Sequence, residues 1–381
     1  MDFNITETQQ GFVKEARSVA EQIAPGYKQR EIDRRIEPEL RREIGARGLI
    51  APELPRELGG RGEPRLTSGL ITEEIARGDF NVAYLQVVGS LVGQILAANA
   101  VPDVARHWVP RITSGEGIVA IGLSEPAAGS DAGNPSLSAR PERGGWVLNG
   151  TKSMSFALQA EAAVVFAKTD AAQRRGRGIS AFVVDLSAPG IEMEGIEDMG
   201  TRAVTRGMAH FTEAWIPATN LLGAQDQGFT QVMQGFDFSR ALIGLQCIGA
   251  AAVTVEETWE YVKGREAFDQ PLSRFQGVAF PLAESETLLT AARLMCQQTL
   301  WLKDEGLPHT SQAAMCKWWA PKTAYDVINQ CLLLHGQFGY KTDRPIEQRM
   351  RDVLGLQIGD GTAQIMKTII ARQSAGRAYA P

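Results

Sequence analysis

The stretch from Gly355 to Gln364 contains one carboxylate whose two neighbours in the sequence have no side chains. Asp360 stands between two glycines, and a helix-like run follows Gln364. One interpretation is a tight turn, because Asp favours turns and Gly reaches backbone angles that other residues avoid. The other interpretation is a general base on a backbone that lets a ligand come close. The remaining motifs of the chain favour the second.

A loop from Leu123 to Asp131 is rich in small residues and comes directly after a predicted strand. Such a loop can present backbone N–H groups and hydroxyls to a phosphate or to the edge of a heterocycle. A plain surface loop has the same composition, since loops favour Ser and Gly. The loop is therefore a candidate ligand site whose support must come from other motifs.

The segment from Arg265 to Gln276 joins two predicted helices. Arg265 and Arg274 are candidate phosphate ligands, and Phe268 is a candidate platform for a ring. The structural alternative is helix capping together with a buried phenylalanine.

His335 opens another glycine loop, where a histidine is more often structural than catalytic. The other histidines are isolated, so the sequence indicates no Ser/His/Asp arrangement and no metal site. They are His107, His210 and His309.

The chain has 381 residues, of which 44% are hydrophobic, and a net charge of −5. This is typical of a soluble globular protein with more than one core, because single cores stop growing at roughly 250–300 residues. The mild acidity argues against nucleic acid or an anionic membrane as a partner. The longest apolar run, Ala241 to Val253, is too short to span a bilayer.

Two further features predict a cytoplasmic protein. The N-terminus is polar and acidic and does not resemble a secretory signal. The four cysteines share no CxxC spacing and lie in helix-like apolar runs, which is typical of reduced core residues. They are Cys247, Cys296, Cys316 and Cys331.

The pattern of apolar residues divides the chain into three regions. Residues 1–116 form a helical domain: Thr6 and Gln9 make a capping box, Pro25 ends the first helix, and apolar residues recur at helical spacing. The further helices are predicted at 38–48, 66–77, 80–99 and 104–112.

Residues 117–224 consist of short β-branched runs separated by glycine-rich turns, which predicts an antiparallel sandwich or barrel. The strands are predicted at 117–124, 146–148, 162–168, 179–186, 191–197 and 207–212. From 225 to 381 the helical period returns, which favours a four-helix up-down bundle with ligand sites between facing helices. Its helices are predicted at 236–261, 275–302, 313–335 and 349–374, the last interrupted at 359–361. The fold class is therefore α+β.

Across nearly its whole length the chain resembles the flavin-dependent acyl-CoA dehydrogenases. One motif alone would be weak, but seven occur in the family's order on its helical, β, helical layout. They are Leu123 to Asp131, Asn149 to Lys152, Met199 to Arg202, Arg265 with Phe268 and Gln276, His335-Gly336 with Gly339, Met350 to Asp352, and Asp360 to Gln364.

The resemblance implies FAD as the cofactor. Arg265, Phe268 and Gln276 would hold the FAD of a neighbouring subunit, which implies a homo-oligomer, usually a tetramer. Leu123 and Ser124 would meet the flavin ring. The full set implied for FAD is Leu123, Ser124, Gly129, Ser130, Met154, Ser155, Arg265, Phe268, Gln276, Gly336, Thr362 and Gln364.

Asp360 falls where most of the family carries a Glu that removes the α-proton of an acyl thioester while hydride leaves the β-carbon for flavin N5. A flavin hydroxyl and the backbone N–H of Asp360 would polarise the thioester oxygen. Electron-transferring flavoprotein is the expected electron acceptor. The residues implied for the acyl-CoA substrate are Ser130, Asp237, Arg240, Gly359 and Gly361.

The sequence departs from the family pattern around the base. Asp360 is one methylene shorter than Glu, and Gly359 stands where many relatives have a bulky Tyr. Met154 and Ser155 take the places of a Trp and a Thr, and Ser239 offers no second base. A shorter base beside a wider pocket predicts a branched or cyclic α-carbon.

Within the family this pattern resembles cyclohexane-1-carboxyl-CoA dehydrogenase, which would give cyclohex-1-ene-1-carbonyl-CoA. The alternative is a short branched-chain acyl-CoA such as isobutyryl- or 2-methylbutyryl-CoA. The DNA-binding branch of the same fold would need a basic face or tail, which the net charge of −5 argues against. An acyl-CoA oxidase is usually a longer chain.

Overall fold

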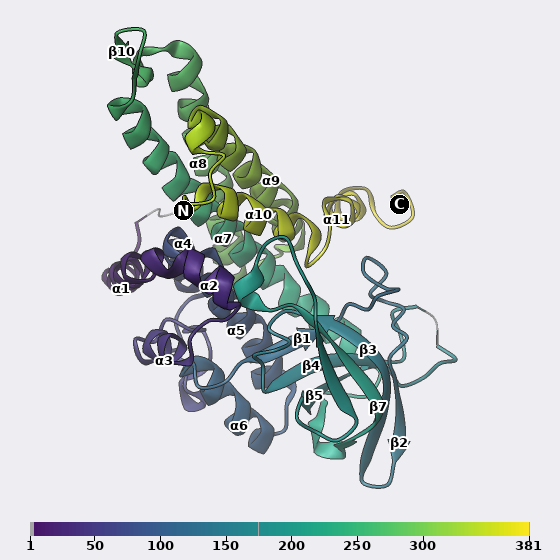
Figure 1. Cartoon of the computed structure of the whole chain (residues 1–381). Helices are drawn as coiled ribbons and strands as arrows, with labels where there is room; N and C mark the ends of the chain where they lie inside the picture. Colours follow the sequence, from purple (N-terminus) through teal and green to yellow (C-terminus); the bar gives the residue numbers. More distant parts are fainter. Residues whose placement is uncertain (1–3, 174, 381) are drawn as a thin grey trace.

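The computed structural model describes residues 4–173 and 175–380 of the chain. Helices α1–α6 come first, a mixed β-sheet follows, and the long helices α7–α11 complete the chain. Figure 1 shows the early helices and the sheet side by side beneath the long C-terminal helices. The predicted order of helices, β-structure and helices is confirmed.

The N-terminal helices begin with the predicted capping box. Thr6 Oγ1 accepts a hydrogen bond from Gln9 N (3.2 Å), and Gln9 Oε1 accepts one from Thr6 N (3.0 Å). A short helix after Pro25 was not predicted, because it has too few residues to show a helical period. The helices are α1 (Glu7–Ile23), α2 (Tyr27–Asp33), α3 (Pro38–Ala46), α4 (Arg65–Gly78), α5 (Phe80–Asn99) and α6 (Pro102–Thr113).

The middle of the chain forms one sheet of eight strands in the order β6-β7-β3-β2-β4-β5-β8, with β1 paired to β4. It is antiparallel except where β1 and β2 run parallel to β4, a difference from the predicted all-antiparallel arrangement. The β2–β3 hairpin intervenes between β1 and β4, and this crossover permits the parallel pair. The strands are β1 (Val119–Gly122), β2 (Ser138–Glu142), β3 (Gly145–Met154), β4 (Ala162–Lys168), β5 (Ile179–Asp185), β6 (Ile191–Gly195), β7 (Gly207–Pro217) and β8 (Leu221–Leu222).

The C-terminal helices pack around α7, which contacts α4, α5, α8 and α9. Two glycines allow the close approach: a Cβ at Gly244 would lie 2.5 Å from Cys296 Sγ, and one at Gly249 would lie 2.2 Å from the carbonyl oxygen of Glu73. The elements are α7 (Gly228–Gly264), the hairpin β9–β10 (Glu266–Ala267 and Gln270–Pro271), α8 (Gln276–Asp304), α9 (Thr310–Leu334), α10 (Ile346–Ile358) and α11 (Ala363–Ala375).

Two helices are long and apolar enough to cross a membrane, namely α5 and residues 235–264 of α7. Their most apolar windows are 89% and 94% buried inside the protein, as expected for core helices. The apolarity of both helices is therefore explained by packing within the fold.

Asp352 of α10 joins the three regions of the chain. Its Oδ2 accepts hydrogen bonds from Tyr27 Oη of α2 (2.5 Å) and Asn81 Nδ2 of α5 (3.0 Å), and its Oδ1 accepts one from Thr201 N (2.5 Å) in the β-region. The residue is buried, and desolvation raises the pKa of its carboxyl to about 6.

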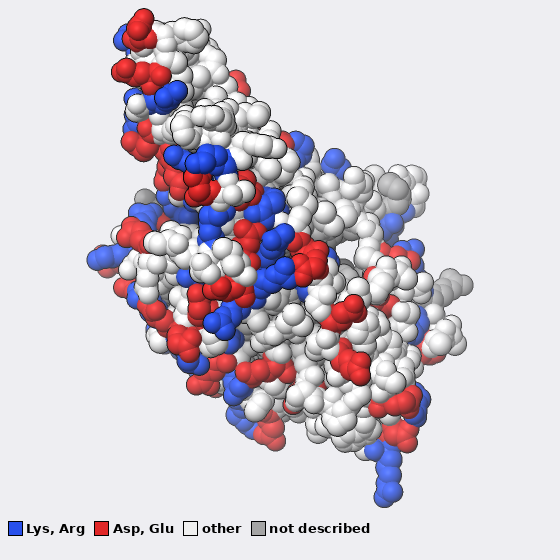
Figure 2. Space-filling view, viewed as in Figure 1, with Lys and Arg blue, Asp and Glu red and all other residues white. Residues whose placement is uncertain are grey.

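Ion pairs also connect α2 to α10, among them Lys28–Glu347 (2.9 Å) and Arg351–Glu31. Side chains of both signs are mixed over this region in Figure 2. The contact between α2 and α10 therefore has ion pairs at its edge and the hydrogen bonds of Asp352 at its centre.

Asp352→Asn should lower the free energy of unfolding by about 2–4 kcal/mol, measured by chemical denaturation, because one amide oxygen cannot replace both carboxylate oxygens as acceptors. Asp343→Asn is the matched control, since Asp343 is exposed and pairs only with Lys341. That control should leave unfolding nearly unchanged. Equal stability of the Asp352 variant and the wild type would contradict the assigned role.

Candidate active site

Asp360 lies in a tight turn between α10 and α11. Gly359 N donates to the carbonyl oxygen of Gly355 (2.9 Å) and ends α10, and the side chain of Thr362 caps α11 by accepting from Ile365 N (3.4 Å). Asp360 itself has a φ of +56°, in the left-handed region that non-glycine residues avoid. The segment is thus a turn, as the simpler interpretation held, and the question is what its carboxylate faces.

Two cations on facing helices act on the charge of Asp360. Desolvation raises the pKa of its carboxyl, while the charges of Lys317 on α9 and Arg240 on α7 act in the opposite direction. Burial lowers the pKa of Lys317 to about 8, and the charge of Asp360 opposes that shift. Both positive charges therefore favour the ionised form of Asp360.

Asp360 as a residue is solvent-exposed in the single chain, yet protein surrounds its carboxyl densely enough for desolvation to act on it. The turn thus leaves Asp360 accessible, while neighbouring protein partly desolvates its carboxyl. Such a place suits a base that must meet a ligand entering from outside.

The surroundings of the turn are unobstructed at Gly359. A Cβ there would meet only the carbonyl oxygen of Gly355, at 3.6 Å. Ser239 is buried and its hydroxyl donates to the carbonyl oxygen of Phe236 (3.3 Å), so this position supplies no second carboxylate. Asp360 is therefore the candidate base at this turn.

The loop from Leu123 to Asp131 is anchored by a buried ion pair. Lys152 Nζ lies 2.7 Å from Glu125 Oε1, with side-chain exposures of 0% and 1%, and also donates to the carbonyl oxygen of Leu123 (3.1 Å). Ser153 N donates to the carbonyl oxygen of Ser124 (2.9 Å). The loop is thus fixed against β3 at its start.

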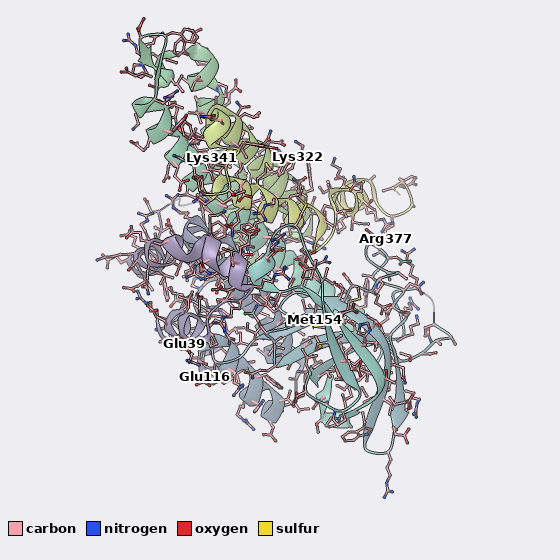
Figure 3. The ribbon with its side chains drawn as sticks, viewed as in Figure 1. Glu39, Glu116, Met154, Lys322, Lys341 and Arg377 are labelled. Atoms are coloured by element: carbon pink, nitrogen blue, oxygen red, sulfur yellow. The ribbon has the colours of Figure 1, made fainter. Side chains whose placement is uncertain are left out.

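This anchoring leaves the tip of the loop accessible, and Ser124, Gly129 and Ser130 are exposed. Met154, labelled on the sheet in Figure 3, is buried, and a Cβ at Gly122 would lie 3.1 Å from its Cε atom. The predicted residues of this loop and of the end of β3 therefore lie together.

Tyr84 of α5 connects this edge of the sheet with Asp360. Its ring meets Phe156, which follows Ser155, edge to face with centroids 6.5 Å apart. Burial and then the charge of Asp360 raise the pKa of Tyr84 well above its usual value, so its phenol stays neutral. Sequence reasoning missed Tyr84, although a tyrosine in an otherwise apolar helix was a signal.

Lys317 was missed as well. Its Nζ donates to the carbonyl oxygens of Leu356 (2.6 Å) and Gly361 (3.1 Å), on the two sides of Asp360. A lysine within the apolar run of α9 was the available signal, because lysines are rarely fully buried unless they are paired.

Asp237 and Arg240 form a pair on α7. Arg240 Nη1 lies 2.7 Å from Asp237 Oδ1, and Thr310 Oγ1 donates to Asp237 Oδ2 (2.6 Å). Within the described part of the chain, Arg240 Nε has no hydrogen-bond partner although it is buried. This pair therefore has one buried donor uncommitted among the described residues.

The predicted residues Arg265, Phe268 and Gln276 lie at the opposite end of α7, on and beside the β9–β10 hairpin. At about 1.5 Å of rise per residue, Arg240 and Arg265 are separated by about 38 Å along α7. Phe268 is 90% exposed, so the structural alternative of a buried phenylalanine is wrong. The centroid of its ring lies 6.2 Å from that of Phe275.

Gly336 belongs to the same far end. The preceding residue, His335, is buried and stacks on Tyr261 of α7 with ring centroids 4.3 Å apart. Its Nδ1 is hydrogen-bonded to the carbonyl oxygen of Cys331 (2.9 Å), so His335 has a structural position. Gly336 has a φ of +57° and open space at its Cβ position.

The predicted residues thus form two groups within one chain. The first comprises the loop after β1, the end of β3 and the α10–α11 turn, where Thr362 caps α11 and Gln364 is exposed. The second lies about 38 Å away along α7, at the hairpin.

Comparison with known proteins gives a consistent result. Models of the N-terminal, middle and C-terminal domains of acyl-CoA dehydrogenase match residues 6–116, 120–214 and 226–375. The mitochondrial short-chain specific acyl-CoA dehydrogenase of Rattus norvegicus is 35% identical over 334 residues, which cover 87% of this chain and 81% of the relative.

Two solved structures share the fold closely. Butyryl-CoA dehydrogenase from Megasphaera elsdenii has a TM-score of 0.95 at 29% identity and covers 98% of this chain and 100% of its own. A chain from a structure of the electron transferring flavoprotein of Acidaminococcus fermentans has a TM-score of 0.95 at 30% identity. The match covers 98% of this chain and 99% of that chain.

The carboxyl of Asp360 should titrate at a higher pH than that of Asp343, because desolvation raises the pKa of Asp360 while a hydrogen bond from Lys341 lowers that of Asp343. Carboxyl-carbon NMR across a pH series would measure both, with the Asp360→Asn variant assigning the signal. The difference should be modest, since Asp360 keeps contact with solvent. A lower midpoint for Asp360 than for Asp343 would contradict the desolvation of the Asp360 carboxyl.

Proposed function

Because the chain belongs to the acyl-CoA dehydrogenase family, we propose that it oxidises the α,β-bond of a cyclic acyl-CoA thioester. The proposed substrate is cyclohexane-1-carboxyl-CoA and the product is cyclohex-1-ene-1-carbonyl-CoA. The observation that carries the proposal is the exposed Asp360, on whose carboxyl the charges of Lys317 and Arg240 act, with open space beside it at Gly359.

FAD is the cofactor of this family, and the residues of the loop after β1 fit it. Ser124 and Ser130 offer exposed hydroxyls, and Gly129 has no atom within 4 Å of its Cβ position, so the anchored loop leaves room for a large polar ligand. When bound, FAD supplies a hydride acceptor, which no side chain can replace. Leu123, Met154 and Ser155 are the further residues proposed to contact it on this side.

Asp360 takes the α-proton in the proposed reaction. A base must be ionised, and Lys317 and Arg240 favour the carboxylate form against the desolvation that raises its pKa. The α-proton passes to an Asp360 oxygen, the β-hydrogen leaves with its electron pair as hydride, and the α,β double bond forms. The backbone N–H of Asp360 is proposed to polarise the thioester oxygen.

The preference for a cyclic group rests on the length of the base and on the space beside it. An aspartate reaches one methylene less far than a glutamate, so the α-carbon must come closer to the backbone of the turn. Open space at Gly359 permits such an approach by a bulky α-carbon. A straight chain would leave that space poorly filled, which costs contact energy.

Two other acyl groups are the competing candidates. A short branched chain such as isobutyryl- or 2-methylbutyryl-CoA also presents a substituted α-carbon. A short straight chain is favoured by the names of the relatives, since they include short-chain specific and butyryl-CoA dehydrogenases.

The hairpin residues imply a shared site between subunits. Arg265, Phe268 and Gln276 lie about 38 Å from the level of Arg240 along α7, so they are placed to serve another chain's FAD, with Gly336 beside its adenosine part. Exposed apolar side chains of α8 and α9 also favour association. They include Phe280, Leu288 and Leu333. A homotetramer in the cytoplasm is the proposed form.

The proposed electron acceptor is an electron-transferring flavoprotein, in keeping with the structural relative from Acidaminococcus fermentans. The DNA-binding branch of the fold finds no support, because the net charge is −5 and the face in Figure 2 shows both signs mixed.

The test is flavin bleaching in the purified protein under anaerobic conditions. Cyclohexane-1-carboxyl-CoA should bleach the flavin and turn over with a dye acceptor faster than isobutyryl-, 2-methylbutyryl- or butyryl-CoA. Faster turnover of any of these linear or branched substrates would remove the cyclic assignment. Rapid peroxide formation in air would instead indicate an oxidase.

Asp360→Asn should abolish dehydrogenation and retain FAD, because the amide cannot take the α-proton while the cofactor contacts are unchanged. Turnover and flavin absorbance of the same preparation would measure both. The matched variant Asp360→Glu lengthens the base and should shift preference towards straight chains. Wild-type turnover in Asp360→Asn would show that another group is the base.

A further inference from the structure

We propose that Lys317 positions Asp360 by binding the backbone on both sides of it. This inference rests on the proposed function, in which Asp360 takes the α-proton. Lys317 does not touch substrate in this proposal, so it is a positioning residue rather than a catalytic one.

The ammonium group of Lys317 connects the end of α10 to the residue after the base. Its Nζ lies 2.6 Å from the carbonyl oxygen of Leu356 and 3.1 Å from that of Gly361. Leu356 is in the last turn of α10, where carbonyl groups lack helical partners and a positive charge is favourable. The segment that contains Asp360 is therefore closed into a loop by one side chain of another helix.

Packing alone does not account for a lysine at this position. Lys317 is only 1% exposed and lies among buried residues of α9 such as Ala313, Cys316 and Ala320. An aliphatic residue would fill the same space without the cost of removing a charge from water. Within residues 4–173 and 175–380, no carboxylate lies within 4.0 Å of its ammonium group. The two carbonyl oxygens are thus the direct partners of the charge.

The turn requires such a restraint because Asp360 has a φ of +56°. A left-handed backbone is unfavourable for most residues other than glycine, and aspartate is among the few others that adopt it. An aspartate also has one rotatable bond fewer than a glutamate, so its carboxyl follows the backbone closely. Misplacement of a reacting group by about 1 Å can cost about a hundredfold in rate.

The charge of Lys317 has a second effect on the base. The groups that act on Lys317 are Asp360 of the turn and Arg240 and Cys247 of α7. Without the ammonium group, Arg240 is the cation that still opposes desolvation of Asp360. The pKa of Asp360 should then rise, and the acid limb of the pH–rate profile should move to higher pH.

Lys317→Met tests the proposal, because methionine keeps a similar length and has no donor. Flavin reduction by acyl-CoA should slow by at least about tenfold, with KM little changed and the acid limb at higher pH. Backbone amides of residues 357–363 should exchange with deuterium faster, which is a readout independent of turnover. The FAD content should stay the same.

Lys322→Met is the matched control. Lys322 lies on the same helix, is exposed and pairs with Asp326, and it is labelled in Figure 3. Its rates, pH profile and exchange should equal those of the wild type. Lys317→Gln retains amide donors without the charge and should give slower exchange at the turn than Lys317→Met, with the same shift of the acid limb.

Unchanged rates, pH profile and amide exchange in a folded Lys317→Met would overturn the proposal. So would failure of both Lys317 variants to fold, since that would assign Lys317 to stability. The function proposed above fails differently: the wild type would then reduce its flavin with none of the acyl-CoA thioesters.

Discussion

One buried carboxylate, that of Asp352, sets the relative positions of the three regions of the chain. A buried acceptor must keep its donors, because an unpaired polar group away from water costs free energy. Its donors come from α2, from α5 and from the backbone of Thr201 in the β-region. Helix α10 is therefore held against two other layers at once, and the turn that ends α10 inherits this placement.

The two cations that act on Asp360 favour its carboxylate form without forming a direct ion pair with it. Lys317 and Arg240 both act on Asp360, yet neither is within 4.0 Å of its carboxylate among the described residues. A direct ion pair would occupy the lone pairs that must accept a proton. Lys317 binds backbone carbonyls and Arg240 binds Asp237, so each cation contributes its field while its hydrogen bonds are used elsewhere.

Much of the fold follows from local patterns in the sequence. The capping box at Thr6, the buried strand β4 and the apolar helix α5 were predicted because their own residues specify them. Strand β2 was missed because Ser138–Glu142 is polar and largely exposed, and it is held in the sheet by β3. Its pairing is decided by partners far away in the sequence.

Some residues of the candidate site were likewise recognisable from local sequence patterns, and others were not. The turn at Asp360 and the loop after β1 were recognisable from glycines, a carboxylate and hydroxyls within short stretches. Tyr84 and Lys317 were not, because each belongs to an apolar helix and gains its role from the neighbour that packing provides. The exposure of Phe268 likewise depends on the hairpin extending beyond the bundle.

The glycines of α7 and the glycine of the α10–α11 turn differ in how readily a larger residue can replace them. At Gly244 and Gly249 the neighbouring helices approach so closely that any added methyl group would collide with Cys296 or with the backbone of Glu73. Substitution of either glycine by a larger residue would therefore require the neighbouring helices to move apart. Gly359, in contrast, faces open space, so descendants of this sequence can carry a larger residue at this turn while the scaffold stays constant.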